Sequence, residues 1–164
     1  MTDGGNVLTA DGSGSVGLED LVVDFLNTLD VEDATDELAT EDGLQSWAAG
    51  RGLLPGELAE VRSLRDALRA VASGEDAELT GVPVRIGVSA RSVALTPETV
   101  TQAVLANAAV LGIQGKLGRV KLCSAHDCAW AFYDRSRNGS RTWCEMGVCG
   151  NRAKARTFRA RASR

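Results

Sequence analysis

Apolar residues in the first half of the chain recur at helical spacing in three segments. Between residues 18 and 29 they fall at i, i+3, i+4, i+7, i+8 and i+11, which predicts an amphipathic helix with a continuous apolar stripe. A second, shorter helix is predicted after Thr40 as N-cap, ending at Gly50. A third follows Pro55 and stops at residues 73–74, where Ser and Gly end the pattern.

The third helix has the clearest division between its two faces. Its apolar face is expected to be buried and comprises Leu58, Val61, Leu64, Leu68 and Val71. Its charged residues are expected to point mostly outward, and they are Glu60, Arg62, Arg65, Asp66 and Arg69.

Beyond a loop at residues 74–81 the apolar period changes to two. Residues 82–88 and 91–95 alternate in this way and predict an antiparallel hairpin closed around Ser89 and Ala90. Thr96-Pro97-Glu98 then predicts the N-cap, first position and acidic first turn of a fourth helix. Helical periodicity ends at residues 112–118, which we take as a domain boundary.

These elements predict an α+β fold. Residues 1–17 are rich in glycine and polar, and they are expected to form a flexible leader. Residues 18–115 form a mainly helical body with one small antiparallel hairpin. Residues 116–164 form a separate C-terminal module.

Charge divides the chain at the same place. Residues 1–115 contain 6 Lys and Arg against 19 Asp and Glu, whereas residues 116–164 contain 12 against 3, so a body of charge −13 precedes a segment of charge +9. A basic segment on an acidic body indicates a polyanion as partner of that end. The alternative is a basic tail that docks on its own acidic body.

The four cysteines, Cys123, Cys128, Cys144 and Cys149, all lie in the basic segment. Two C-x4-C hooks, fifteen residues apart, can supply the four thiolates of a tetrahedral zinc site, so we predict one Zn²⁺ per chain. A disulfide pair and an iron–sulfur cluster are the weaker alternatives. The single histidine, His126, lies inside the first hook and is expected to be a loop residue, because four cysteines already complete the zinc shell.

The residues around the hooks predict a treble-clef-like order of hook, β-hairpin, hook and C-terminal helix. Residues 129–134 should pair with residues 141–144 across an SRNGS turn. After the second hook, Gly150 is expected to take a positive φ and Asn151 to cap the last helix. On that helix a narrow apolar stripe is expected to pack on the hairpin aromatics, and its members are Ala155, Phe158 and Ala162.

Basic residues flank this stripe and are the candidate nucleic-acid contacts. In the hairpin and the last helix they are Arg135, Arg137, Arg141, Arg152, Lys154, Arg156, Arg159 and Arg161. The alternative is that these positions have no binding role, with alanine present as a good helix former and arginine as a solubilising residue. Trp130, Phe132, Tyr133 and Trp143 could stack on unpaired bases if exposed, although most are expected to be core.

The finger, residues 116–164, resembles the CGNR zinc-finger family, whose motif stands here as Cys149-Gly150-Asn151-Arg152. The body resembles the ABATE domain that usually precedes that finger, through VVDFLNTL at 22–29 and LRDALRAV at 64–71. The resemblance implies a bacterial, stress-linked transcription regulator with a DNA-binding finger, and it maps the zinc ligands onto the four cysteines. This chain departs from it in having only a short loop between the LR helix and the hairpin, where relatives commonly carry more helix.

Asp24 and Asn27 are the polar members of the first of these motifs. They lie one helical turn apart, and they could either contact an effector or anchor the fold by hydrogen bonds.

The function expected from the sequence is DNA binding by a zinc-stabilised finger. A zinc-stapled protein-interaction module is the alternative, and RNA remains a possible ligand. An enzyme is not expected, because four thiolates leave zinc no open position and the single histidine has no evident nucleophile partner. The sequence lacks a signal peptide and an apolar run of membrane-spanning length, so a cytoplasmic location without a membrane partner is expected.

Overall fold

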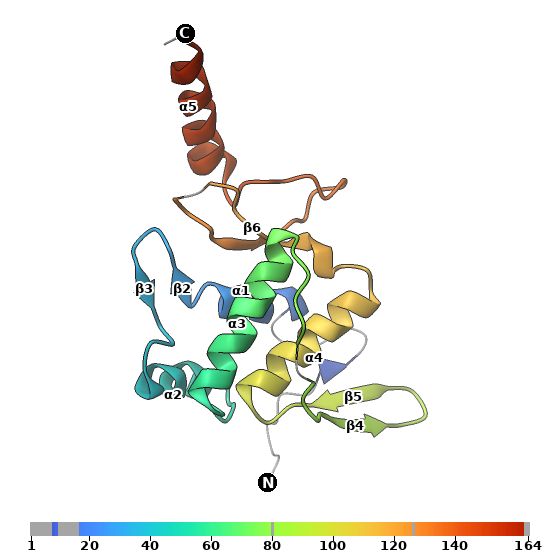
Figure 1. Ribbon diagram of the computed structural model, residues 1–164. Coiled ribbons are helices and arrows are strands. Elements are labelled where there is room, and N and C mark those ends of the chain that lie inside the picture. The colour runs from blue at the N-terminus through green and yellow to red at the C-terminus, as the bar shows by residue number, and fades with distance from the viewer. Residues whose placement is uncertain (1–7, 10–16, 80, 126, 163–164) are drawn as a thin grey trace.

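The computed structural model describes residues 8–9, 17–79, 81–125 and 127–162. Figure 1 shows the helices α1 to α4 gathered in a body, with the finger across one end and its last helix, α5, extending beyond it. The mixture of helices with small antiparallel strand pairs confirms the predicted α+β class.

Helix α1 spans Leu18–Leu26 and buries the predicted stripe as far as Leu26. The prediction was wrong beyond that point, because Leu29 belongs to strand β2 (Leu29–Asp30), which pairs antiparallel with β3 (Thr35–Asp36). After the C-cap Asn27, Thr28 folds back on the helix end, and its Oγ1 donates to the Phe25 carbonyl at 2.8 Å. The apolar residues keep the helical spacing as far as Leu29, although the helix has already ended and Leu29 belongs to the next hairpin.

Helix α2 spans Glu41–Ala49 with the predicted N-cap. The Thr40 side chain accepts a hydrogen bond from the Gly43 amide at 3.2 Å, which satisfies one of the free donors of the first turn. Trp47 is buried and meets Phe25 of α1 edge to face, with ring centroids 5.6 Å apart.

Helix α3 spans Leu58–Ser73 and ends at Gly74, whose φ of 91° is the left-handed conformation that glycine adopts most readily. Its apolar face is packed inward as predicted, with Val61, Leu64 and Leu68 buried. The outward placement of two arginines was wrong, because Arg65 and Arg69 are only 2% and 8% exposed.

The predicted hairpin is formed by β4 (Arg85–Val88) and β5 (Val93–Thr96), and the Ser89 amide donates to the Ser92 carbonyl in the connecting turn. A further strand, β1 (Leu8–Thr9), pairs with β5, so two residues of the predicted leader lie in a sheet. Residues 1–7 and 10–16 lie outside the described part of the chain, and the flexibility of the leader stays a prediction.

Helix α4 spans Val100–Ile113, and its N-cap is Thr99 rather than the predicted Thr96. Thr99 forms a capping box with Gln102, in which each side chain bonds the other residue's backbone. Thr96 instead ends β5. Thr99 forms a parallel bridge with Leu54, so the chain between Thr96 and Thr99 is not yet helical. The cap prediction missed the bridge because its partner lies 45 residues earlier in the chain.

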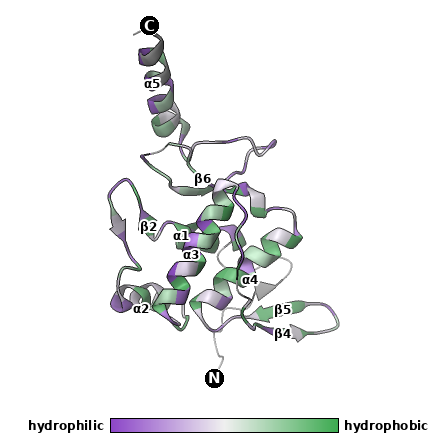
Figure 2. Ribbon diagram, in the orientation of Figure 1, coloured by the Kyte–Doolittle hydropathy of each residue, from purple (hydrophilic) through white to green (hydrophobic). Residues whose placement is uncertain are grey.

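The main core joins α1 to α4 and also takes in Val120 and Ala131 of the finger. Figure 2 shows hydrophobic colour concentrated on the body helices and mixed with hydrophilic colour along α5. Within the described ranges, none of the helices combines the length and apolar character that a membrane crossing needs.

Candidate metal centre

The first cysteine hook is enclosed by a pair of short strands. A single 3-10 turn, η1 (Leu117–Arg119), leads into β6 (Val120–Leu122), which pairs antiparallel with β7 (Ala131–Tyr133). The predicted pairing of residues 129–134 with 141–144 was therefore wrong. Residues 141–144 instead meet the hook, where the Ser124 amide donates to the Thr142 carbonyl at 2.9 Å.

The four cysteine sulfurs form a compact cluster within 4.8 Å of one another. Cys144 Sγ lies 3.7 Å from Cys128 Sγ and 3.7 Å from Cys149 Sγ. A regular tetrahedron with Zn–S bonds of about 2.3 Å has sulfur–sulfur edges of about 3.8 Å, whereas a disulfide bond is about 2.0 Å long. The spacing fits a shared metal, and none of the four cysteines forms a disulfide bond.

The thiols titrate differently because each one's surroundings differ. Burial raises the pKa of the Cys149 thiol to about 11 and also raises the pKa of Cys144. Burial opposes ionisation of Cys123 as well, but hydrogen bonds from the backbone of Cys144 and Ala125 lower its pKa overall. A cation stabilises the thiolate form of cysteines that lie this close together, and Zn²⁺ would supply that charge here.

The second hook runs through a wide π-type turn, η2 (Met146–Gly150), directly into α5 (Asn151–Ala162). Two details of the prediction were wrong. Asn151 is not an N-cap, since its side chain donates to the Gly147 carbonyl one turn back. Gly150 has no positive φ and is small for another reason, because a Cβ there would meet Met146 Sδ and would lie 3.3 Å from Trp143 Cδ1.

Two family models match the chain. The CGNR zinc finger model matches residues 119–162, and the model ABATE, with the description "Putative stress-induced transcription regulator", matches residues 19–130. The second match covers about two thirds of the chain. The protein belongs to the ABATE family. A search of curated proteins finds no match. With the finger match and the sulfur cluster together, the four cysteines form a zinc-binding site for one ion.

The body of this ABATE protein hydrogen-bonds to the finger beside the zinc site. Asn27 uses both ends of its amide, because Oδ1 accepts from the Ala131 amide at 2.7 Å and Nδ2 donates to the Ala131 carbonyl at 3.0 Å. Arg69 donates to the Leu26 carbonyl at 2.7 Å and to the Ala129 carbonyl at 2.9 Å. Ala129 follows the ligand Cys128 and has a φ of 52°. These contacts fix the backbone of the first hook to α1 and α3.

The first arginine of the motif LRDALRAV, Arg65, binds the hairpin formed by β2 and β3. Arg65 donates to Asp36 through both of its terminal nitrogens and to Thr28 Oγ1 at 3.0 Å. The hydrogen bond from Arg65 holds the pKa of Asp36 below its usual range, and the Leu38 amide adds to the effect although burial opposes it. The two family motifs thus contact each other through Thr28 and Arg65.

Asp24 and Asn27 do not form one site. Asp24 is 55% exposed and pairs at 3.4 Å with Arg51, in the turn after α2, whereas Asn27 binds the finger. The Arg51 guanidinium also lies over the Trp47 ring, 3.9 Å from its centroid. Of the two roles considered from the sequence, the contacts of Asn27 match the anchoring one.

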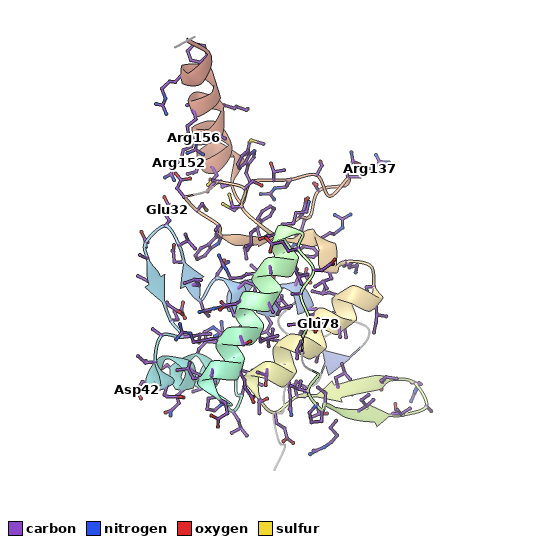
Figure 3. The ribbon with its side chains drawn as sticks, in the orientation of Figure 1. Glu32, Asp42, Glu78, Arg137, Arg152 and Arg156 are labelled. Atoms are coloured by element: carbon purple, nitrogen blue, oxygen red, sulfur yellow. The ribbon has the colours of Figure 1, made fainter. Side chains whose placement is uncertain are left out.

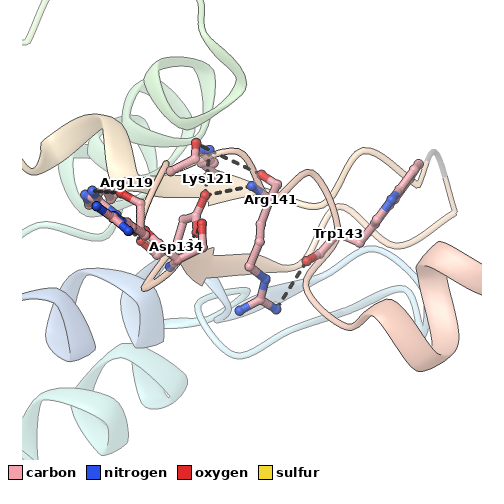
Figure 4. Close-up of polar contacts among 8 residues, drawn as sticks. Arg119, Lys121, Asp134, Arg141 and Trp143 are labelled. Carbon is pink, nitrogen blue, oxygen red and sulfur yellow. Dashed lines mark hydrogen bonds and ion pairs between the residues drawn. The ribbon is translucent and has the colours of Figure 1, made fainter.

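Asp134 organises the loop that follows β7 (Figure 4). Its fully buried carboxylate accepts from Ser136, from the Arg141 amide and from Lys121 Nζ at 2.9 Å. Burial alone would raise its pKa, but these donors hold the pKa of Asp134 well below its usual range. Arg119 binds the carbonyls of Asp134 and Ser136 from the other side. Two cations of the basic segment, Lys121 and Arg119, therefore shape the loop.

Several of the predicted nucleic-acid contacts have partners within the protein, and two of these arginines are bound by the body. Arg135 binds Glu19 and Asp20 of α1, and Arg152 binds Glu32 in the turn between β2 and β3. Both arginines have a raised pKa, chiefly from the hydrogen bonds of Glu19 and Glu32 respectively.

Arg156 and Arg141 have partners inside the finger. Arg156 lies 3.4 Å from Asp127 Oδ2. Arg141 donates to the Cys144 carbonyl at 2.6 Å, and its guanidinium lies 5.2 Å from the Phe132 ring centroid. Arg141 is therefore partly committed to holding the second hook.

Three more of the predicted contacts lie on the loop after β7 and on α5. Arg137, Lys154 and Arg159 are exposed, and the side chain of Arg161 lies outside the described part of the chain, as does His126. The predicted packing stripe of α5 was wrong, since Phe158 is 74% exposed and Ala155 is exposed as well, with the side chain of Ala162 undescribed. Helix α5 instead leans on the finger through its first turns, where Ala153 and Arg156 are half-buried.

The sequence reasoning missed the two buried arginines, Arg65 and Arg69, and the buried Asp134. One signal was available for the arginines. Each arginine directly follows a leucine of the apolar stripe, Leu64 or Leu68. Because the two arginines are four residues apart, both lie on the same side of α3, at the edge of that stripe. No comparable local pattern marks Asp134, whose partners come from β6 and from the loop.

Proposed function

We propose that this ABATE protein is a DNA-binding transcription regulator whose zinc-stabilised finger binds the phosphate backbone. The observation that carries the proposal is the charge of one end of the molecule. The finger has a formal charge of +9, which becomes about +7 when a zinc tetrathiolate of charge −2 is counted. Figure 3 shows Arg137 on the loop side of the finger, and Arg152 and Arg156 at the start of α5.

The shape of this end also suits a nucleic-acid groove. Helix α5 spans 12 residues and extends beyond the body in Figure 1, so a duplex can approach it without meeting the acidic helices. A major groove about 12 Å wide admits an α-helix. Lys154 and Arg159 are exposed on this helix, and Ala155 between them adds little bulk.

Zinc acts structurally in this proposal. Four thiolates fill a tetrahedral shell and leave no position for a water or a substrate. We therefore propose a regulator without enzymatic activity, acting in the cytoplasm on chromosomal DNA.

A protein-interaction module is the second candidate, because the finger also exposes apolar side chains. Phe158 is 74% exposed, Met146 55% and Trp130 38%. Exposed aromatic residues next to arginines are common in protein interfaces and also stack on unpaired RNA bases. Both alternatives are outcomes of the experiment below.

The test is binding of the zinc-loaded full chain to a labelled duplex, followed by fluorescence anisotropy across a salt series. If the finger neutralises about five phosphates, log K falls with log[salt] at a slope of about −4 to −5. Replacing Arg137, Lys154 and Arg159 together by alanine should flatten the slope by about 2 to 3. The matched control replaces the exposed body residues Arg62, Arg85 and Arg91 by alanine and should leave the slope unchanged.

Zinc content and circular dichroism should match the unmodified protein in both variants. A fully zinc-loaded protein that binds no duplex at low salt contradicts the proposal. Binding of single-stranded RNA in its place would favour the RNA alternative, and binding of neither would favour the interaction module.

A further inference from the structure

We propose that the acidic body competes with DNA for the arginines of the finger, because it holds Arg135 and Arg152 through Glu19, Asp20 and Glu32. This regulation rests on the proposed function and concerns the same basic surface.

The first point of competition is the start of α1. Arg135 Nη2 lies 3.1 Å from Glu19 Oε1 and 3.2 Å from Asp20 Oδ1, so one guanidinium meets two carboxylates. Both carboxylates lie in the first turn of α1, where the positive end of the helix dipole favours negative charge. They therefore keep a favourable partner when Arg135 turns toward a phosphate, and the contact can open without unfolding α1.

The second point lies on the other side of the finger. Arg152, in the first turn of α5, donates to Glu32 Oε1 at 2.8 Å, and both side chains are nearly half exposed. In Figure 3 Glu32 lies at the tip of the β2–β3 hairpin, directly below Arg152. The body thus reaches the finger from two separate elements, and each places a carboxylate on an arginine that could bind phosphate.

The contacts of Asn27 and Arg69 make this competition a fixed property of the fold. They hold the backbone at Ala129 and Ala131 against α1 and α3. The finger consequently stays beside the three carboxylates, and a phosphate must displace them or share the arginine. Exposed ion pairs are individually weak, so the competition is modest, and releasing both arginines should strengthen DNA binding about fivefold at low salt.

The experiment compares two full-length, zinc-loaded variants in the duplex assay at about 0.05 M salt. The first carries Glu19→Gln, Asp20→Asn and Glu32→Gln. The control carries Glu41→Gln, Asp42→Asn and Glu78→Gln, which changes the net charge equally through exposed carboxylates that form no ion pair with the described residues of the finger. The first variant should bind about fivefold more tightly than the control, and the difference should shrink to less than twofold at about 0.5 M salt.

A second background shows whether the arginines carry the effect. In a chain with Arg135→Ala and Arg152→Ala, the three body substitutions should strengthen binding no more than the control substitutions do. Equal affinities of the first variant and the control would overturn the inference while leaving DNA binding intact. Absence of duplex binding by every variant, the unmodified protein included, would instead overturn the proposed function.

Discussion

Replacing Arg69 by methionine tests how much this one side chain contributes to holding the body and the finger together. The guanidinium donates to the carbonyls of Leu26 and Ala129, and a hydrogen bond from a charged donor contributes about 1.5–3 kcal/mol. Burial lowers the pKa of Arg69, and the hydration that its guanidinium loses on burial offsets part of this contribution. Methionine fills similar space but leaves both carbonyls unpaired, so the net loss should be about 3 kcal/mol.

Urea unfolding followed by circular dichroism and tryptophan fluorescence measures this loss. With an m value of about 2 kcal/mol/M, the midpoint should fall by about 1.5 M. Arg62→Met on the exposed side of the same helix is the control and should change stability by less than about 0.5 kcal/mol. If the Arg69 variant were as stable as the Arg62 variant, the two carbonyl contacts would contribute nothing and the anchoring argument would be wrong.

Three further predictions concern the zinc site, an ion pair and a glycine. Cys144→Ser should lose the zinc measured by metal analysis and should also lower the melting temperature of the body, whose core includes finger residues. Asp36→Asn should lower the free energy of unfolding by about 3 kcal/mol at pH 7. The difference from the unmodified protein should shrink below about pH 4, because the bond to Arg65 that lowers the pKa of Asp36 stabilises the folded protein only while Asp36 is ionised. Gly43→Ala should destabilise by more than about 2 kcal/mol in the same unfolding assay, since a Cβ would collide with the Glu37 carbonyl, whereas Gly50→Ala meets nothing within 3.5 Å and should be nearly neutral.

The helices of the body could be predicted because their signals are local. The apolar stripe of α3, its end at Gly74 and the Thr40 cap of α2 all depend on residues within a few positions of one another. The same is true of the zinc ligands, since two short hooks gather four thiolates with little constraint from the rest of the chain.

The sequence did not indicate which distant segments would meet, even where it allowed an anchoring role, as for Asn27. Asn27 lies 104 residues from its partner Ala131, and Arg69 lies 60 residues from Ala129. A charged residue on a helix is normally solvated, so the sequence favoured an exposed Arg69, and only the meeting of α1, α3 and β7 makes it buried. The pairing of β7 with β6 was also missed. Residues 141–144, which contain Trp143, looked from the sequence like the strand partner of β7.

The participation of Val120 and Ala131 in the main core bears on how the protein is made. Synthesis proceeds from the N-terminus and domains usually fold as they emerge, but here the last two pieces of the core arrive after all four body helices. The body consequently stays open to chaperones and proteases until the first cysteine hook has been made and closed on its metal. Scarcity of zinc would therefore reduce the amount of the whole protein in the cell, through turnover of incomplete chains, and not only the amount of folded finger.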